Sequence, residues 1–241
     1  MGRFITFGTA FLATGLAASA ASASFTANYM GYGNFQSHSV GYSTALAWNS
    51  VASVSMFNLK LAEHRWEVGG ETVYTWCAQL YQGVTAGNAY QYQAVALELA
   101  PQTPPAPGPM GAAKATILRD AMSRWLDSDG RVVASAGTAD ARTAAFCALA
   151  WEIIHENLQT TDAMVGKGRI SLQSGAFRAG LTGEAAAIFT AMVNSLGQGG
   201  FQGVSAEGWN SPTVQDQFRL VPSPGSIALL GLAGLCVRRR R

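Results

Sequence analysis

Charged side chains are scarce in this chain. Asp, Glu, Lys and Arg make up 12% of its 241 residues, about half of the share that is usual in soluble domains. Hydrophobic residues make up 49%, so the composition excludes an intrinsically disordered protein. The length suits one good-sized domain or two small ones.

Cysteine and histidine are scarce as well, with three of each. So few cysteines exclude a disulfide-rich miniprotein, and none of them lies in a Cys-x-x-Cys pair. The histidines form no recognisable triad with Ser or Cys. The sequence also lacks a Gly-x-Ser-x-Gly motif, a Walker loop and a Gly-x-Gly-x-x-Gly motif in a strand–helix setting.

Positive charge is concentrated at the two ends of the chain. The net charge is +2, but without Arg3 and the arginines at 238–241 there are 11 basic and 14 acidic residues. The rest of the chain is therefore acidic, with a net charge of −3. A basic surface for nucleic acid is not expected.

The N-terminal segment has the features of a secretory signal peptide. Arg3 supplies an early positive charge, a stretch of small apolar residues follows, and an Ala-Ser-Ala pattern ends at Ala23. We expect signal peptidase to remove residues 1–23, with cleavage after Ala20 as the second choice. The mature protein is then exported to a compartment where disulfides persist.

The C-terminal segment, 221–241, has three parts. They are the motif Val221, Pro222, Ser223 and Pro224, a run of 11 uncharged and mostly apolar residues, and the closing Arg238, Arg239, Arg240 and Arg241. The apolar run is short for a full span, but the arginines would hold its end in the cytoplasm. We therefore expect a short C-terminal membrane helix.

This tail resembles the PEP-CTERM sorting signal of exported bacterial proteins. In that family an exosortase, which is a membrane-embedded cysteine transpeptidase, cuts the protein at the Pro-x-Pro motif. The protein is then released to the cell surface or attached there. The resemblance implies that 221–224 is the sorting motif and 238–241 the cytoplasmic stop. Ser223 departs from the commonest form of the motif, which has Glu, and an anchor that stays in the bilayer is the alternative interpretation.

The middle of the chain, residues 24–220, is expected to be a single extracytoplasmic α+β domain. Its N-terminal half is rich in strand-forming residues with short alternations, which predicts hairpins, a sandwich or a barrel-like sheet. The expected strands are Val40–Ala47, Val51–Leu61, His64–Val68, Thr72–Leu80 and Tyr90–Leu99. Gly69 and Gly70 predict a two-residue hairpin turn. In the strand after it, alternation places Thr75 and Cys77 on one face and Trp76 on the other.

The second half predicts about three helices, which would pack against the strands. Apolar periodicity indicates helices over Ala115–Leu126, over about 139–157 after an N-cap at Thr138, and after Thr182, ending at Gly197. The proline-rich segment 100–111 is read as a surface loop within one domain, and a linker between two domains is the alternative.

Sequence motifs for a metal or an active site are weak. Glu152 and His155 have the Glu-x-x-His spacing of di-iron bundles, but no second copy occurs. The segment 127–130 looks like part of a calcium loop but lacks the downstream Glu, which favours a plain turn. The six tryptophans could line a sugar-binding surface, but their scatter favours core packing. No cofactor or metal is expected.

Two cysteines remain in the middle of the chain, Cys77 and Cys147. One lies in an expected strand and the other in an expected helix. Because the compartment is oxidising, we expect them to form a disulfide, worth about 4 kcal/mol for a loop of this length. Two unpaired buried thiols are the alternative.

The residues around these cysteines resemble bacterial thioester domains. The segment 74–80, Tyr-Thr-Trp-Cys-Ala-Gln-Leu, is similar to the strand that carries the thioester cysteine. The segment 146–152 is similar to the Thr-Gln-x-Ala-Ile-Trp motif, and Gln215-Asp216-Gln217 near the end also fits. In that family a cysteine and a glutamine join into an internal thioester, which couples a surface adhesin to an amine. The resemblance assigns Cys77 to the thioester cysteine.

The same resemblance has a departure at the second motif. Cys147 stands where the glutamine is expected, so no thioester is expected between these two positions. We therefore expect an inert disulfide in place of a reactive bond. The sequence as a whole predicts a non-enzymatic surface or matrix protein with an adhesive or structural role, in contact with exopolysaccharide. The alternatives are a carbohydrate-binding module and a secreted hydrolase.

Overall fold

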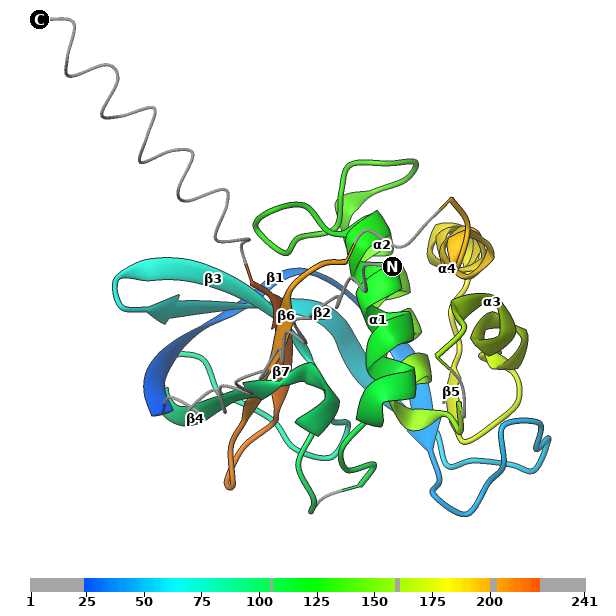
Figure 1. Cartoon of the computed structure of the whole chain (residues 1–241), viewed down its shortest axis with the longest axis horizontal. Coiled ribbons are helices and arrows are strands. Elements are labelled where there is room, and N and C mark those ends of the chain that lie inside the picture. The colour runs from blue at the N-terminus through cyan, green and yellow to red at the C-terminus, as the bar shows by residue number, and fades with distance from the viewer. Residues whose placement is uncertain (1–23, 105, 159–160, 200–202, 222–241) are drawn as a thin grey trace, which may run out of the picture.

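A computed structural model describes residues 24–104, 106–158, 161–199 and 203–221 (Figure 1). The expected signal peptide, its cleavage site at Ala23 and the tail from Pro222 to Arg241 lie outside these residues. Val221 is the last described residue, and its N–H donates to the carbonyl oxygen of Ser205 at 2.9 Å. No helix among the described residues is long and apolar enough to cross a membrane.

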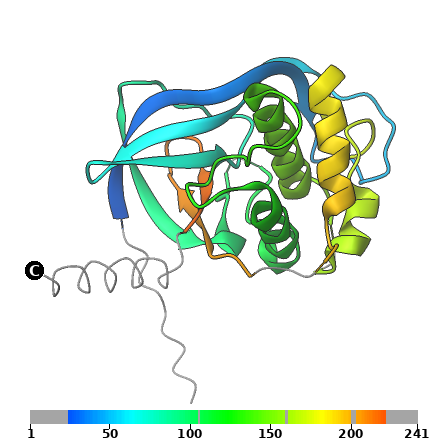
Figure 2. The same cartoon turned by 90° about the horizontal axis from the view of Figure 1, so that it is seen from above.

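The strands form one sheet that closes on itself (Figures 1 and 2). Its described strands are β1 (Ser24–Tyr42), β2 (Phe57–Val68), β3 (Glu71–Cys77), β4 (Ala89–Ala96), β5 (Phe177–Ala179), β6 (Ala206–Asn210) and β7 (Gln217–Leu220). Their order is β2-β3-β7-β6-β4-β1-β5, and β1 also pairs with β2. The described strands pair with one another in antiparallel fashion. The expected barrel-like sheet is thus confirmed.

The first strand differs most from its prediction. The expected strand Val40–Ala47 is wrong, because β1 starts at Ser24 and ends at Tyr42. Successive parts of β1 pair with β4, β2 and β5, with irregularities between Tyr29 and Gly31 and between Tyr32 and Phe35. Because these bulges shift the alternation of inward and outward side chains, the period-two pattern is broken in the sequence.

The hairpin of β2 and β3 is close to its prediction. Gly69 and Gly70 have φ angles of +61° and +88°, the left-handed values that a two-residue hairpin turn requires. The expected strands Val51–Leu61 and His64–Val68 are one continuous strand, β2, which begins only at Phe57. The expected strand Tyr90–Leu99 ends earlier, because a short 3₁₀ helix occupies Leu97–Leu99.

Three of the helices were predicted. They are α1 (Gly111–Trp125), α2 (Ala139–His155) and α4 (Gly183–Ser195), and the one-turn α3 (Ala163–Gly166) was not predicted. All of them lie on one side of the sheet (Figure 2). Thr138 caps α2, since its hydroxyl accepts from the N–H of Ala141. Thr182 holds the N-cap position of α4, but its side chain makes no capping hydrogen bond.

Hydrophobic residues form two clusters on opposite faces of the sheet. The larger cluster lies between the sheet and the helices, and nearly every residue of α2 is buried in it. The smaller one consists of aromatic residues inside the closed sheet, including Tyr29, Trp66, Tyr92 and Trp209. The larger cluster takes residues from both sides of the segment 100–111, such as Leu97 and Leu118. This segment therefore joins two parts that share one core.

Candidate functional site

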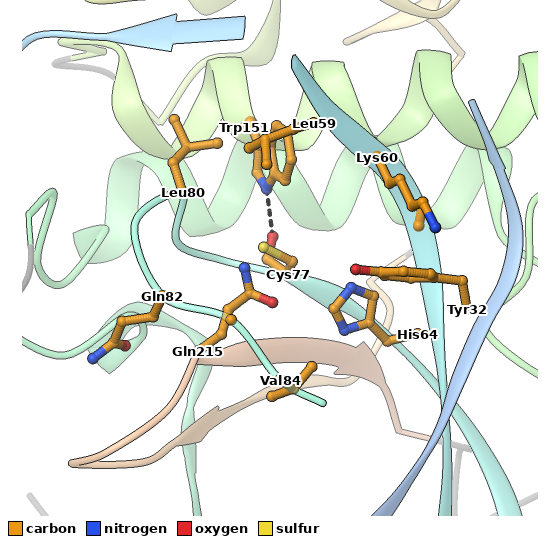
Figure 3. Close-up of a pocket in the computed structure, with 12 residues that line it drawn as sticks. Tyr32, Leu59, Lys60, His64, Cys77, Leu80, Gln82, Val84, Trp151 and Gln215 are labelled. Carbon is orange, nitrogen blue, oxygen red and sulfur yellow. Dashed lines mark hydrogen bonds between the residues drawn. The ribbon is translucent and has the colours of Figure 1, made fainter. Parts of the chain in front are cut away.

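Cys77 lies at the end of β3, where the closed sheet meets α2. Its carbonyl oxygen accepts a hydrogen bond of 2.7 Å from Nε1 of Trp151, drawn in Figure 3. The expected faces of this strand are confirmed. The ring of Trp76 packs on Phe146 of α2, with centroids 4.6 Å apart, whereas Thr75 donates to Gln217 on the other side of the strand.

A cavity of about 110 Å³ lies beside Cys77 (Figure 3). We call it the Cys77 cavity. Its wall includes Lys60, Ala62, His64, Cys77, Trp151 and Gln215. Tyr32, Lys60 and Gly83 also line it and are exposed, so the cavity opens to the surface. Its volume suits several water molecules or the tip of a side chain, but not a whole sugar ring.

The side chain of Gln215 points into this cavity and lies beside Cys77 (Figure 3). The carbonyl oxygen of Gln79 accepts from Sγ of Cys77 at 2.8 Å and from Nε2 of Gln215 at 2.8 Å. Sγ of Cys77 and Nε2 of Gln215 are therefore separated by no more than twice 2.8 Å. Sequence reasoning noted Gln215 as part of a matching motif, but it assigned this residue no contact with Cys77.

Asp216 fixes the segment that carries Gln215. Its Oδ1 accepts from the N–H of Ser211 at 2.7 Å, and its Oδ2 accepts from the N–H of Gln102 at 2.7 Å. Its own N–H donates to Oε1 of Gln79 at 3.0 Å. Burial raises the pKa of Asp216 to about 6. Gln102 belongs to the proline-rich loop, so this loop helps to hold Gln215 in place.

The Cys77 thiol is protonated at neutral pH. Burial raises its pKa to about 12. His64 in the same cavity is also uncharged, since burial lowers its pKa to about 3. The reacting groups of the cavity are therefore neutral, and Lys60 at its rim supplies a positive charge.

The expected disulfide between Cys77 and Cys147 is not formed in the structure. Both residues are buried free thiols. The thiol of Cys77 donates to the carbonyl oxygen of Gln79 instead, and Cys147 has a hydrogen bond with the backbone of Ala62. The two thiols are close enough for charge on Cys77 to raise the pKa of Cys147. Cys147 does not line the Cys77 cavity; Gln215 does.

A second cavity, of about 320 Å³, lies at the C-terminal end of α2. Its lining includes Lys114, His155 and Glu156. Both carboxylate oxygens of Glu156 accept backbone hydrogen bonds, from Asn157 and Ala176. Glu152 is not part of the lining, so the paired carboxylates that a hydrolase would require do not meet in this cavity.

The remaining motif candidates have structural roles. Nδ1 of His155 donates a hydrogen bond of 2.9 Å to the carbonyl oxygen of Trp151, and Glu152 is fully buried. Within the described residues no group of three or more His, Cys, Asp or Glu side chains could hold a metal ion. The segment 127–130 is a turn, in which Oδ1 of Asp127 accepts from the N–H groups of Asp129 and Arg131.

The tryptophans pack into the fold. All six belong to the described residues, and none is exposed. Four are buried, and Trp48 and Trp125 are half-buried. A sugar-binding face with two or three exposed tryptophans, as a carbohydrate-binding module would require, is therefore not found on the described surface.

Comparisons with protein-family models, with curated proteins and with solved structures find no match to this chain.

Proposed function

We propose that this protein is an exported surface or matrix protein that attaches itself covalently to a partner through an internal thioester between Cys77 and Gln215. One observation carries the proposal: both side chains bind the same carbonyl oxygen, each at 2.8 Å, in a cavity that opens to the surface. The glutamine of this bond comes from the segment before β7, so Cys147 on α2 does not prevent it.

The bond forms by attack of Sγ of Cys77 on Cδ of Gln215. The thiol proton passes to the amide nitrogen, the Cδ–Nε2 bond breaks, and ammonia leaves. A buried thiol with a raised pKa is a weak nucleophile in a bimolecular reaction. Here the two groups are neighbours in a rigid fold, and such proximity replaces much of the required activation.

Gln215 is a better candidate than the two other buried glutamines nearby. The amide of Gln79 is engaged at both ends, with the carbonyl oxygen of Gln102 and the N–H of Asp216. The amide of Gln217 is engaged by Thr75 and by the carbonyl oxygen of Gln215. The amide of Gln215 is engaged at both ends as well, by the carbonyl oxygen of Gln79 and by Nε2 of Gln217. The cavity separates the three candidates, because Gln215 lines it and Gln79 and Gln217 do not.

Intact mass of the exported protein tests the bond. We expect the protein to be lighter than its sequence by one ammonia, and Cys77→Ala and Gln215→Ala to have full sequence mass. Because these variants share the termini of the wild type, the comparison does not depend on the cleavage sites. Gln82→Ala, which changes another residue of the cavity wall, is the matched control and should still lose ammonia.

Two other masses would overturn the proposal. A loss of two hydrogens means that Cys77 and Cys147 form the disulfide expected from the sequence. Full sequence mass in the wild type, with both thiols open to alkylation after denaturation, means that neither bond forms.

The route to the surface is a separate part of the proposal. The tail 221–241 directs the protein to an exosortase, as its likeness to the PEP-CTERM signal implies. Locating the protein in cells with and without residues 221–241 tests this part. We expect loss of the surface or matrix location on truncation, and an unchanged location would refute the sorting role without affecting the thioester.

A further inference from the structure

His64 is a buried side chain of the Cys77 cavity, and one of its ring nitrogens is not engaged in a hydrogen bond with the described residues. Its side chain is 4% exposed, and Nδ1 has no hydrogen-bond partner among the described residues. The rings of Tyr29, Tyr32 and Trp66 surround it, with centroids 5.2, 5.3 and 6.5 Å away. A buried nitrogen without a hydrogen-bond partner destabilises the fold. A hydrocarbon ring at this position would pack against the same aromatic neighbours without that cost. Packing alone therefore does not explain the histidine.

The register of the sheet places His64 near the proposed bond. His64 pairs with Thr75 across β2 and β3, and Cys77 lies two residues further along the same face. Such diagonal neighbours are roughly 7–8 Å apart between their Cα atoms. Both residues line the cavity together with Gln215, and the ring of His64 lies on the cavity side of its strand (Figure 3).

We propose that His64 is a catalytic base that directs the acyl group of Gln215 to a hydroxyl of a polysaccharide. This inference rests on the proposed function, because it requires the Cys77–Gln215 thioester. It adds the class of acceptor, a carbohydrate hydroxyl, and the residue that activates it.

The transfer balances without any further reactant. The acceptor oxygen attacks Cδ of Gln215, and the bond between Cδ and Sγ breaks. The imidazole of His64 takes the hydroxyl proton at one ring nitrogen and delivers a proton to the departing sulfur. The products are an ester on Gln215 and a free thiol on Cys77.

The environment of the cavity supports this proton transfer. Burial lowers the pKa of His64 to about 3, so the ring is neutral before the reaction and does not retain a proton that it takes up. Burial raises the pKa of Cys77 to about 12, so the sulfur leaves readily only when it is protonated. The imidazole therefore transfers the proton from the hydroxyl to the sulfur and is neutral again at the end.

Lys60 at the cavity rim favours a hydroxyl over an amine. It lies on the same face of β2 as Ala62 and His64, and its Nζ stands 4.9 Å from the ring centre of Tyr32. An acceptor amine is protonated at neutral pH and is repelled by this ammonium group. A sugar hydroxyl is neutral, and an acidic polysaccharide would be attracted.

Glycerol and methylamine serve as probes that differ in the acceptor atom. Each is added to the exported protein, and the ester, the methylamide and the hydrolysed product are followed by intact mass. In His64→Phe and His64→Gln we expect transfer to glycerol and to water to slow about 100-fold, whereas transfer to deprotonated methylamine changes by less than about threefold. In Lys60→Met we expect transfer to methylamine to rise about threefold. His38→Gln, which changes a half-exposed histidine outside the cavity, should react like the wild type.

The outcomes separate the two proposals. If the wild type has not lost ammonia, the thioester itself is absent. If the thioester is present but the His64 variants slow all acceptors equally, or none, then His64 is not the base. If neither His64 variant forms the thioester, the products of the wild-type protein are the test. A glycerol ester supports the inference, and a methylamide without any ester overturns it.

Discussion

Glu63 is a buried carboxylate that pairs with Arg131. It is 1% exposed, and its Oε1 accepts from Arg131 at 2.8 Å and from the N–H of Asn34 at 3.1 Å. Arg131 comes from the turn after α1, so this pair connects the sheet to the helical side of the molecule. The Arg131 side chain is 39% exposed, but its removal leaves the buried carboxylate without a counter-charge.

Arg131→Met is expected to lower the free energy of unfolding by about 3 kcal/mol. Urea unfolding measures this change. The matched control is Arg119→Met, whose partner Glu98 is partly exposed at 32%, and the expected loss there is at most about 1 kcal/mol. Equal losses in the two variants would contradict the role of burial.

His155 makes stability depend on pH in the acidic range. Burial lowers its pKa to about 3, whereas an unfolded histidine has a pKa of about 6.5. As pH falls below 6.5, the unfolded chain takes up the proton first, so folding stability is lost. Between pH 6.5 and 5 the expected loss from this one group is about 2 kcal/mol.

His155→Phe should therefore flatten the stability profile over this pH range relative to the wild type. Urea unfolding at pH 7, 6 and 5 measures the difference. His38→Gln, at a half-exposed position on β1, is the control and should keep the wild-type slope. A His155→Phe slope equal to that of the wild type would show that the buried imidazole is not responsible.

At the scale of the element, the two threonine caps offer a matched comparison. Thr138 accepts from the N–H of Ala141 at 3.3 Å, and its hydroxyl donates to Oε2 of Glu184 at 2.7 Å. Thr138→Ala should cost about 1 kcal/mol of unfolding free energy. Thr182→Ala removes no capping hydrogen bond and should change stability by a few tenths of a kcal/mol, about what surface substitutions do. A comparable loss in both variants, measured by urea unfolding, would contradict the capping role.

The elements with a strong local signal were predictable from sequence. α1, α2 and α4 have apolar periodicity and long runs of helix-forming residues, and Gly69 and Gly70 mark the hairpin. The short strands β5, β6 and β7 have three to five residues each. They gain their stability from pairing with distant strands, which leaves little local pattern to recognise.

The site was predictable in part. Alternation along β3 placed Cys77 and Thr75 on one face, as the structure confirms. The neighbour of Cys77 was not predictable, because Gln215 is 138 residues away in the chain and arrives only when β7 pairs with β3. The sequence motif around Cys147 indicated α2 as the element that carries the partner of Cys77. In the structure, closure of the sheet decides which glutamine lies beside Cys77.

At the scale of the whole molecule, the proposed bond ties together two distant parts of the chain. A cross-link that closes a loop of this length restricts the unfolded chain by about 5 kcal/mol. Opening the thioester with methylamine should therefore lower Tm by about 10 °C or more, as measured by calorimetry. Cys77→Ala treated with methylamine is the control and should not shift. An intact thioester whose opening leaves Tm unchanged would contradict the cross-link's effect on stability.

The position of Gln215 near the end of the domain has a mechanical consequence. Only five residues lie between it and Val221, where the proposed sorting segment begins. If a partner is bonded to Gln215 and the protein is tethered by its C-terminal end, tension between cell and partner passes through this short stretch of backbone. Most of the sheet and all the helices would lie outside the stretched path, so the domain could stay folded while its attachment is pulled.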